Sequence, residues 1–114
     1  VVALLPETVP TAGLAFAEVL ATSDLPSGVV NLLSGRYSEL LPHLASHVEV
    51  DALNLCGVAE SDRTPYEQAA AESITRVHHS PNLSREEWLI DAAQGLGWIE
   101  PFLEFKTVWH PLGW

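Results

Sequence analysis

Short apolar runs rich in β-branched residues alternate along the chain with longer segments whose apolar residues recur at helical spacing. The short runs lie at Val1–Leu5, Val29–Leu33, Val50–Cys56 and Ile74–His78. The helical segments lie at Thr11–Leu20, Ser38–His47 and Pro65–Glu72. This alternation predicts successive β-α-β units and an α/β fold with a largely parallel sheet. Because Val29–Leu33 is apolar at every position except Asn31, we expect it to be a strand buried on both faces.

The pattern changes after Ser80. Ser84–Glu87 resembles a capping box, in which two side chains satisfy free backbone amides, and it predicts a helix from Trp88 to Ala93. Phe102–Trp109 alternates between two faces and predicts an isolated strand with no hairpin mate nearby. We therefore divide the chain into residues 1–80 and residues 81–114.

The composition is that of one folded domain: 114 residues, of which 47% are hydrophobic and 18% charged. Fifteen acidic residues against five basic ones give a net charge of −10. The bases stand singly, at Arg36, Arg63, Arg76, Arg85 and Lys106. Nucleic acid and anionic membrane surfaces are therefore not expected as partners, because both require clustered basic residues. No apolar run approaches the roughly 20 residues of a membrane-spanning helix, and no signal peptide is expected.

The single cysteine, Cys56, excludes an internal disulfide, which is typical of cytoplasmic proteins. We expect a cytoplasmic location on that ground. The sequence contains no methionine and opens directly on an apolar run. We therefore expect the chain to be a piece of a longer one.

The histidines and the cysteine have side chains that can bind metal or act as nucleophiles, but they also serve ordinary structural roles. His43 and His47 are four residues apart on a predicted helix, and His78 and His79 are neighbours on the next strand. Because no cluster of cysteines, histidines or carboxylates completes a ligand set, we predict no metal site. Cys56 has no identifiable partner base, and we expect it to be a small buried hydrophobe rather than a nucleophile.

Four tryptophans fall near the C-terminal end of the chain, at positions 88, 98, 109 and 114. They are expected either to form part of a partner-binding surface or to cover this chain's own sheet.

The order of particular residues carries a family resemblance. A strand is followed by Glu7 and Pro10, then a helix, then the phrase Leu25–Asn31 (Leu-Pro-Ser-Gly-Val-Val-Asn) and Gly35. Further on come His47, the pair Val50-Asp51 and a strand that ends in Leu55–Val58. In this respect residues 1–80 resemble the cofactor-binding half of an aldehyde dehydrogenase. Phe102–Trp109 is similar to the closing strand of that family, which belongs to its oligomerisation region.

The resemblance implies a three-layer, Rossmann-like fold that binds NAD. It assigns a cofactor role to Glu7, through a ribose hydroxyl, and to Gly35 and Gly57, in the turns near the adenosine and phosphates. It also implies a homo-oligomer or hetero-oligomer formed through Phe102–Trp109.

The chain departs from the family where chemistry is needed. Leu4 stands in place of the lysine that holds the ribose, Tyr37 and Leu41 in place of glycines, and Val58 in place of a serine at the pyrophosphate. The general-base glutamate falls at Ser80, whose hydroxyl cannot act as a base near neutral pH. The segment that should carry the nucleophilic cysteine is absent. We therefore predict no catalytic residue and no cofactor, with NAD as the one alternative.

Three hypotheses follow. The chain is a non-catalytic assembly or regulatory domain, a fragment of an NAD(P)-dependent aldehyde dehydrogenase whose catalytic residues lie elsewhere, or an isolated nucleotide-binding module.

Overall fold

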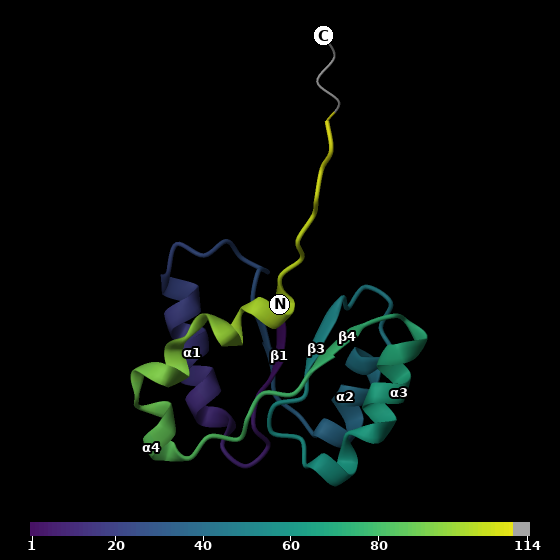
Figure 1. Cartoon of the computed structure of the whole chain (residues 1–114). Helices are drawn as coiled ribbons and strands as arrows, with labels where there is room; N and C mark the ends of the chain where they lie inside the picture. Colours follow the sequence, from purple (N-terminus) through teal and green to yellow (C-terminus); the bar gives the residue numbers. More distant parts are fainter. Residues whose placement is uncertain (111–114) are drawn as a thin grey trace. The chain divides into compact units, whose positions relative to one another are not determined.

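The computed structural model describes residues 1–110 and separates into two compact units, Val1–His79 and the segment from Ser80 onward. Strands and helices alternate in the first unit (Figure 1). Their bounds are β1 (Val2–Leu4), α1 (Pro10–Thr22), β2 (Asn31–Leu33), α2 (Tyr37–Ala45), β3 (Ala52–Asn54), α3 (Thr64–Glu72) and β4 (Arg76–His78), with a 3-10 turn at Glu60–Asp62. The element order predicted from the apolar pattern is confirmed.

The four strands form two parallel pairs. In the first pair β1 lies beside β2, and in the second β3 lies beside β4. A helix joins the members of each pair, α1 in the first and α3 in the second, as parallel pairing requires. The fold is therefore α/β with small parallel sheets.

Strand β2 is less buried than its sequence predicts. Leu33 is 41% exposed, and Val29, just before the strand, is 43% exposed. The expectation that Val29–Leu33 is buried on both faces is therefore wrong for this chain. A run that is apolar along almost its whole length is typical of a strand covered by layers on both sides. In the part of the chain that the structure describes, β1 is the only ladder partner of β2.

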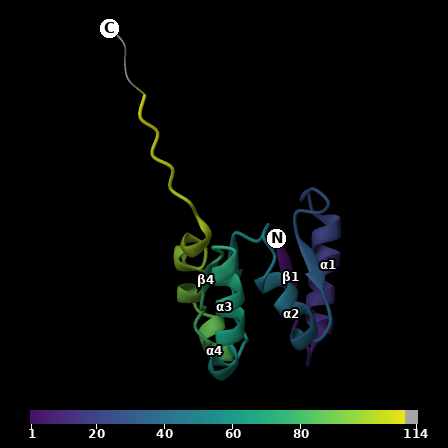
Figure 2. The same cartoon turned by 90° about the vertical axis from the view of Figure 1, so that its right-hand side faces the viewer.

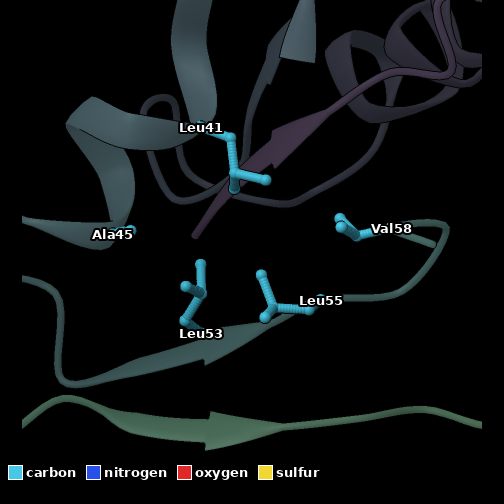
Figure 3. Close-up of a cluster of buried hydrophobic side chains, with 5 residues drawn as sticks. All are labelled: Leu41, Ala45, Leu53, Leu55 and Val58. Atoms are coloured by element: carbon cyan, nitrogen blue, oxygen red, sulfur yellow. The ribbon is translucent and has the colours of Figure 1, made fainter. Parts of the chain in front are cut away.

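The core of the first unit lies between α2 and β3. Its buried side chains are Leu41 and Ala45 from α2, Leu53 from β3, and Leu55 and Val58 from the segment that follows (Figure 3). Leu4, Tyr66, Ala69 and Val77 pack against this cluster. Burying one leucine side chain fully, as at Leu55, contributes about 1.5–3 kcal/mol. Figure 2 shows α1 and α3 on opposite flanks of the unit, with β1 and α2 between them.

Helix α1 approaches the end of β1 at a glycine. A Cβ atom on Gly13 would lie 2.2 Å from Cδ2 of Leu5, which is itself only 7% exposed. The missing side chain therefore makes room for Leu5 beneath the helix. No residue of α1 is buried, and Leu14, Phe16 and Val19 each keep more than half of their surface exposed.

Helix α3 ends in a Schellman motif built on an isoleucine. The amide of Thr75 donates to the carbonyl of Ala70 at 2.9 Å, and that of Ile74 to the carbonyl of Ala71 at 3.3 Å. This pattern places Ile74 in the left-handed region, with φ 59°. The hydroxyl of Thr75 then donates to the carbonyl of Val50 at 2.7 Å, which ties the helix end to the segment before β3.

The second unit begins with the predicted capping box. Ser84 Oγ accepts from the amide of Glu87 at 3.3 Å, and the amide of Ser84 donates to the Glu87 carboxylate at 2.7 Å. The helix α4 (Arg85–Trp88) is shorter than predicted, because Ile90 turns to an extended conformation. Short 3-10 turns follow at Asp91–Gln94, Leu96–Trp98 and Glu100–Phe102. The rings of Trp88 and Trp98 stack with centroids 5.1 Å apart.

The segment Leu103–His110 forms neither helix nor strand (Figure 1). Its large side chains are open to solvent, with Phe105 93% and Trp109 89% exposed. The strand predicted at Phe102–Trp109 does not form in the single chain, since a strand needs a ladder partner and none is near in sequence. Trp114 lies outside the described residues. Within residues 1–110, no helix has both the length and the apolar character to cross a bilayer.

Candidate functional site

The residues assigned to cofactor binding follow the carboxyl ends of three strands. Glu7 comes after β1, Gly35 after β2 and Gly57 after β3. In doubly wound α/β folds ligands bind at the carboxyl ends of the strands, because the loops after parallel strands lie at the same edge of a sheet. β1 and β2 form one sheet and β3 belongs to the other, so Glu7 and Gly35 follow strands of the same sheet and Gly57 does not.

Glu7 makes an internal contact. Its Oε1 accepts a hydrogen bond from the backbone amide of Tyr37, the first residue of α2. The residue before the helix, Arg36, makes no side-chain capping bond to α2. The carboxylate of Glu7 instead satisfies an amide that has no partner within the helix. An anion at a helix N-terminus is also favoured by the helix dipole. The structure thus joins the loop after β1 to the start of α2.

The phenol of Tyr37 lies close to this contact. Partial burial raises the pKa of Tyr37, and the nearby charges of Glu7 and then Cys56 raise it further. The phenol therefore stays protonated well above neutral pH.

Cys56 is exposed, so the expectation that it is buried is wrong. Burial alternates here: Leu53 and Leu55 point into the core, whereas Asn54 and Cys56 face outward. The amide of Cys56 donates to the side-chain oxygen of Asn54 at 3.1 Å. This local bond holds the turn that leads to Gly57.

The two glycines of the site differ in their surroundings. A Cβ on Gly35 would lie 2.8 Å from Cδ1 of Leu40, so a leucine of the chain itself covers this glycine. Gly57 has φ +81° and nothing within 4 Å of the place where a Cβ would be. The turn at Gly57 requires a left-handed residue, and the face above it is open.

Leu40 was not singled out from the sequence, which pointed instead to Tyr37 and Leu41 as residues filling this edge. Tyr37 does lie there, but Leu41 points into the core and is 5% exposed. Helical spacing explains why Leu40 and not Leu41 covers Gly35. Adjacent residues of α2 point about 100° apart, so only one of the two can lie over the glycine.

At three positions where the resemblance places polar groups that hold the cofactor or act as the base, this chain has side chains that are wholly or partly buried. Val58 is 9% exposed within the core cluster, and Leu4 packs against it. Ser80, at the place of the general base, is 3% exposed. A dinucleotide would therefore meet apolar side chains, the partly buried Leu4 and the buried Val58, instead of hydrogen-bond donors, and the residues present do not fit that cofactor.

The histidines are engaged separately. His79 Nε2 lies 3.0 Å from Glu67 Oε1, and His47 Nδ1 accepts from the amide of Glu49 at 3.2 Å. Among the residues that the structure describes, no three His, Cys, Asp or Glu side chains lie close enough together to hold a metal ion.

Comparison with known proteins places the chain in a family. Residues 1–80 match the model of the "Aldehyde dehydrogenase family". An "Aldehyde dehydrogenase" of Davidiella tassiana is 31% identical over 98 residues, which cover 82% of this chain and 19% of that protein. "Aldehyde dehydrogenase 1" of Tanacetum cinerariifolium is 31% identical over 71 residues, which cover 62% of this chain and 14% of that protein. The chain thus spans less than a fifth of either relative, and no solved structure matches it. The resemblance found in the sequence is confirmed: the chain belongs to the aldehyde dehydrogenase family.

Proposed function

We propose that this chain is a non-catalytic aldehyde dehydrogenase domain that acts as an assembly or regulatory element. The observation that carries the proposal is that Val58 is buried in the core and that the partly buried Leu4 packs against it. Hydride transfer to NAD requires the dinucleotide to be held in place by oriented donors. Apolar side chains that stabilise the fold at these places cannot supply them.

The position of Ser80 supports the same conclusion. A general base must reach the proton that it removes and must have a pKa near the working pH. A serine hydroxyl does not have a pKa near neutral pH. Ser80 is also only 3% exposed, so its hydroxyl cannot reach a substrate at the surface.

Assembly is proposed to use the segment Phe102–Trp109. Within residues 1–110, residues 105–109 belong to no strand, and Phe105 and Trp109 are almost fully exposed. Such a segment is suited to β-augmentation, in which main-chain bonds to a partner strand supply affinity and alternate side chains supply specificity. The partner is a second copy or a related chain with a free strand edge.

An activity assay tests the non-catalytic role. The chain is mixed with NAD or NADP and a panel of aliphatic and aromatic aldehydes, and reduced cofactor is followed by its absorbance, with an active aldehyde dehydrogenase as positive control. We expect no aldehyde-dependent signal from this chain alone. Reproducible turnover by the purified chain would refute the proposal.

Light scattering after gel filtration tests assembly. We expect a mass above that of the monomer and its loss when residues 100–114 are removed. A monomer of unchanged mass in both cases would exclude this segment as the interface.

A second candidate is a fragment of an NAD(P)-dependent aldehyde dehydrogenase. It is favoured by the small share of the relatives that the chain covers, 19% and 14%. In that protein the β1–β2 and β3–β4 pairs would join a three-layer, Rossmann-like sheet, with base and nucleophile supplied by other residues. The intact mass of the natural product separates the candidates, since a fragment comes from a much larger polypeptide. For either candidate we assign the reducing cytoplasm, where an exposed thiol such as Cys56 is stable.

A further inference from the structure

We propose that Glu7 and the first turn of α2 form an internal latch, in which the carboxylate of Glu7 is a helix cap and positioning residue instead of a ribose ligand. The proposal is separate from the assembly role, because such a latch can exist in a chain that assembles and in one that does not. It concerns the loops that follow β1 and β2.

The latch rests first on a hydrogen bond between distant segments. Glu7 lies in the loop after β1, and the amide that it accepts from belongs to Tyr37, 30 residues later. Arg36, which precedes the helix, provides no side-chain cap, and its guanidinium lies 3.7 Å from Glu39 instead. The carboxylate of Glu7 therefore caps the helix from outside it, by accepting from the first of the four amides that have no partner within the helix.

The second observation is the filling of the same edge by α2. Leu40 covers Gly35, so that a Cβ on this glycine would lie 2.8 Å from the leucine Cδ1. The space that the missing side chain of Gly35 leaves beside the backbone is thus filled by the side chain of Leu40 and not by a ligand. With Glu7 bonded to the helix and Gly35 covered, two of the three residues assigned to NAD are occupied by internal contacts.

The alternative gives Glu7 the role that its family position implies. A carboxylate that accepts from a ribose hydroxyl needs free lone pairs directed at the ligand. The Tyr37 amide engages Oε1 of Glu7, so a ribose hydroxyl bound through that oxygen would compete with the amide. The two roles predict opposite effects of removing the carboxylate, on stability for the latch and on dinucleotide affinity for the ribose ligand.

The test compares Glu7→Ala and Glu7→Gln with Glu18→Ala and Glu18→Gln in the full chain. Glu18 is an exposed carboxylate of α1, and only its backbone carbonyl accepts a hydrogen bond, from the Thr22 hydroxyl. The two sites therefore receive the same change of charge. We expect Glu7→Ala to raise the unfolding equilibrium constant in urea about fivefold, as loss of a helix cap does, and Glu18→Ala to change it less than about twofold.

A second measurement is independent of stability. The carboxylate of Glu7 raises the pKa of the Tyr37 phenol, so Glu7→Gln should lower that pKa while Glu18→Gln leaves it unchanged. The ionisation is followed by ultraviolet absorbance, and Tyr37→Phe identifies the signal by removing it. This effect reports the proximity of the carboxylate and would not follow from a general loosening of the fold.

Calorimetric titration with NAD completes the test. The latch predicts no difference in NAD affinity between the wild-type chain and Glu7→Gln. If Glu7→Gln bound NAD more weakly than the wild-type chain, while the unfolding equilibrium constant and the pKa of Tyr37 were unchanged, the latch would be refuted and Glu7 would be assigned as a ribose ligand. An unchanged unfolding constant in Glu7→Ala would overturn it as well.

Discussion

Ile74 is the residue at which a single substitution should make this chain more stable. It occupies the C′ position of the Schellman motif after α3, with φ 59°, where glycine is usual. A β-branched side chain is strained in this region because its Cβ crowds the carbonyl that follows. The side chain gains nothing in return, since Ile74 is 91% exposed. Ile74→Gly should therefore relieve strain without losing packing.

Two opposing contributions set the size of the effect. The left-handed conformation costs a non-glycine residue about 1–2 kcal/mol. Glycine in turn gives the unfolded chain more freedom, which costs about 0.5–1 kcal/mol. The difference is a gain of about 0.5–1 kcal/mol in the free energy of unfolding, which corresponds to a rise in Tm of roughly 2–8 °C for a domain of this size.

Urea denaturation followed by circular dichroism measures this gain as a higher midpoint at unchanged slope. Ile74→Ala is the matched control, because it shortens the side chain while keeping the strain of a Cβ, and should change the midpoint little. Gly57→Ala is the reciprocal control. Gly57 has φ +81° with open space around it, so an added Cβ should cost about 1 kcal/mol through conformation alone. A lower midpoint for Ile74→Gly than for the wild-type chain would refute the reasoning.

Three further substitutions test the core and the caps. Gly13→Ala should lower the urea midpoint, because its Cβ would meet the buried Leu5 and overpacking costs about 1–3 kcal/mol, more than the helix propensity gained. Leu55→Ala should cost about 2–5 kcal/mol, since Leu55 is fully buried, and a loss below about 1 kcal/mol would show that the cluster is not the core. Hydrogen bonds from the Ser84 amide and hydroxyl lower the pKa of Glu87. The stability that they provide is therefore present above the ordinary pKa of a glutamate and lost as the pH falls through the lowered value. Tryptophan fluorescence should report this loss on acidification, and Glu87→Gln should abolish its pH dependence.

The features that the sequence predicts well are those decided by local physics. The alternation of apolar runs and helical segments predicts every strand and α-helix of the first unit in the observed order. The capping box at Ser84 and Glu87 is also predicted, because both of its bonds join residues three apart. In each case the partners lie close in sequence, so that pattern and spacing are sufficient.

The features that the sequence predicts poorly depend on contacts between segments that are distant in the sequence. The apolar run Val29–Leu33 indicates covering layers but not whether this chain supplies them. The alternation of Phe102–Trp109 indicates a strand but not its partner. At the site, the position of Glu7 after β1 follows from the pattern, whereas its bond to Tyr37 and the cover of Leu40 over Gly35 depend on how α2 meets the loops.

The proposed function implies that the apolar residues at the cofactor positions also stabilise the fold, and Val58 offers a test. Val58→Ser restores the hydroxyl that the family places at the pyrophosphate, but it removes a methyl group from the core and buries a hydroxyl at a position that is 9% exposed. These two changes should cost about 2 kcal/mol in the free energy of unfolding. Val58→Thr keeps the volume and isolates the cost of the hydroxyl. We expect both variants to have lower urea midpoints and neither to bind NAD in calorimetry, because Leu4 remains apolar and Glu7 remains bonded to Tyr37. If Val58→Ser were as stable as the wild-type chain and bound NAD, the apolar core could not be the reason that the site is lost.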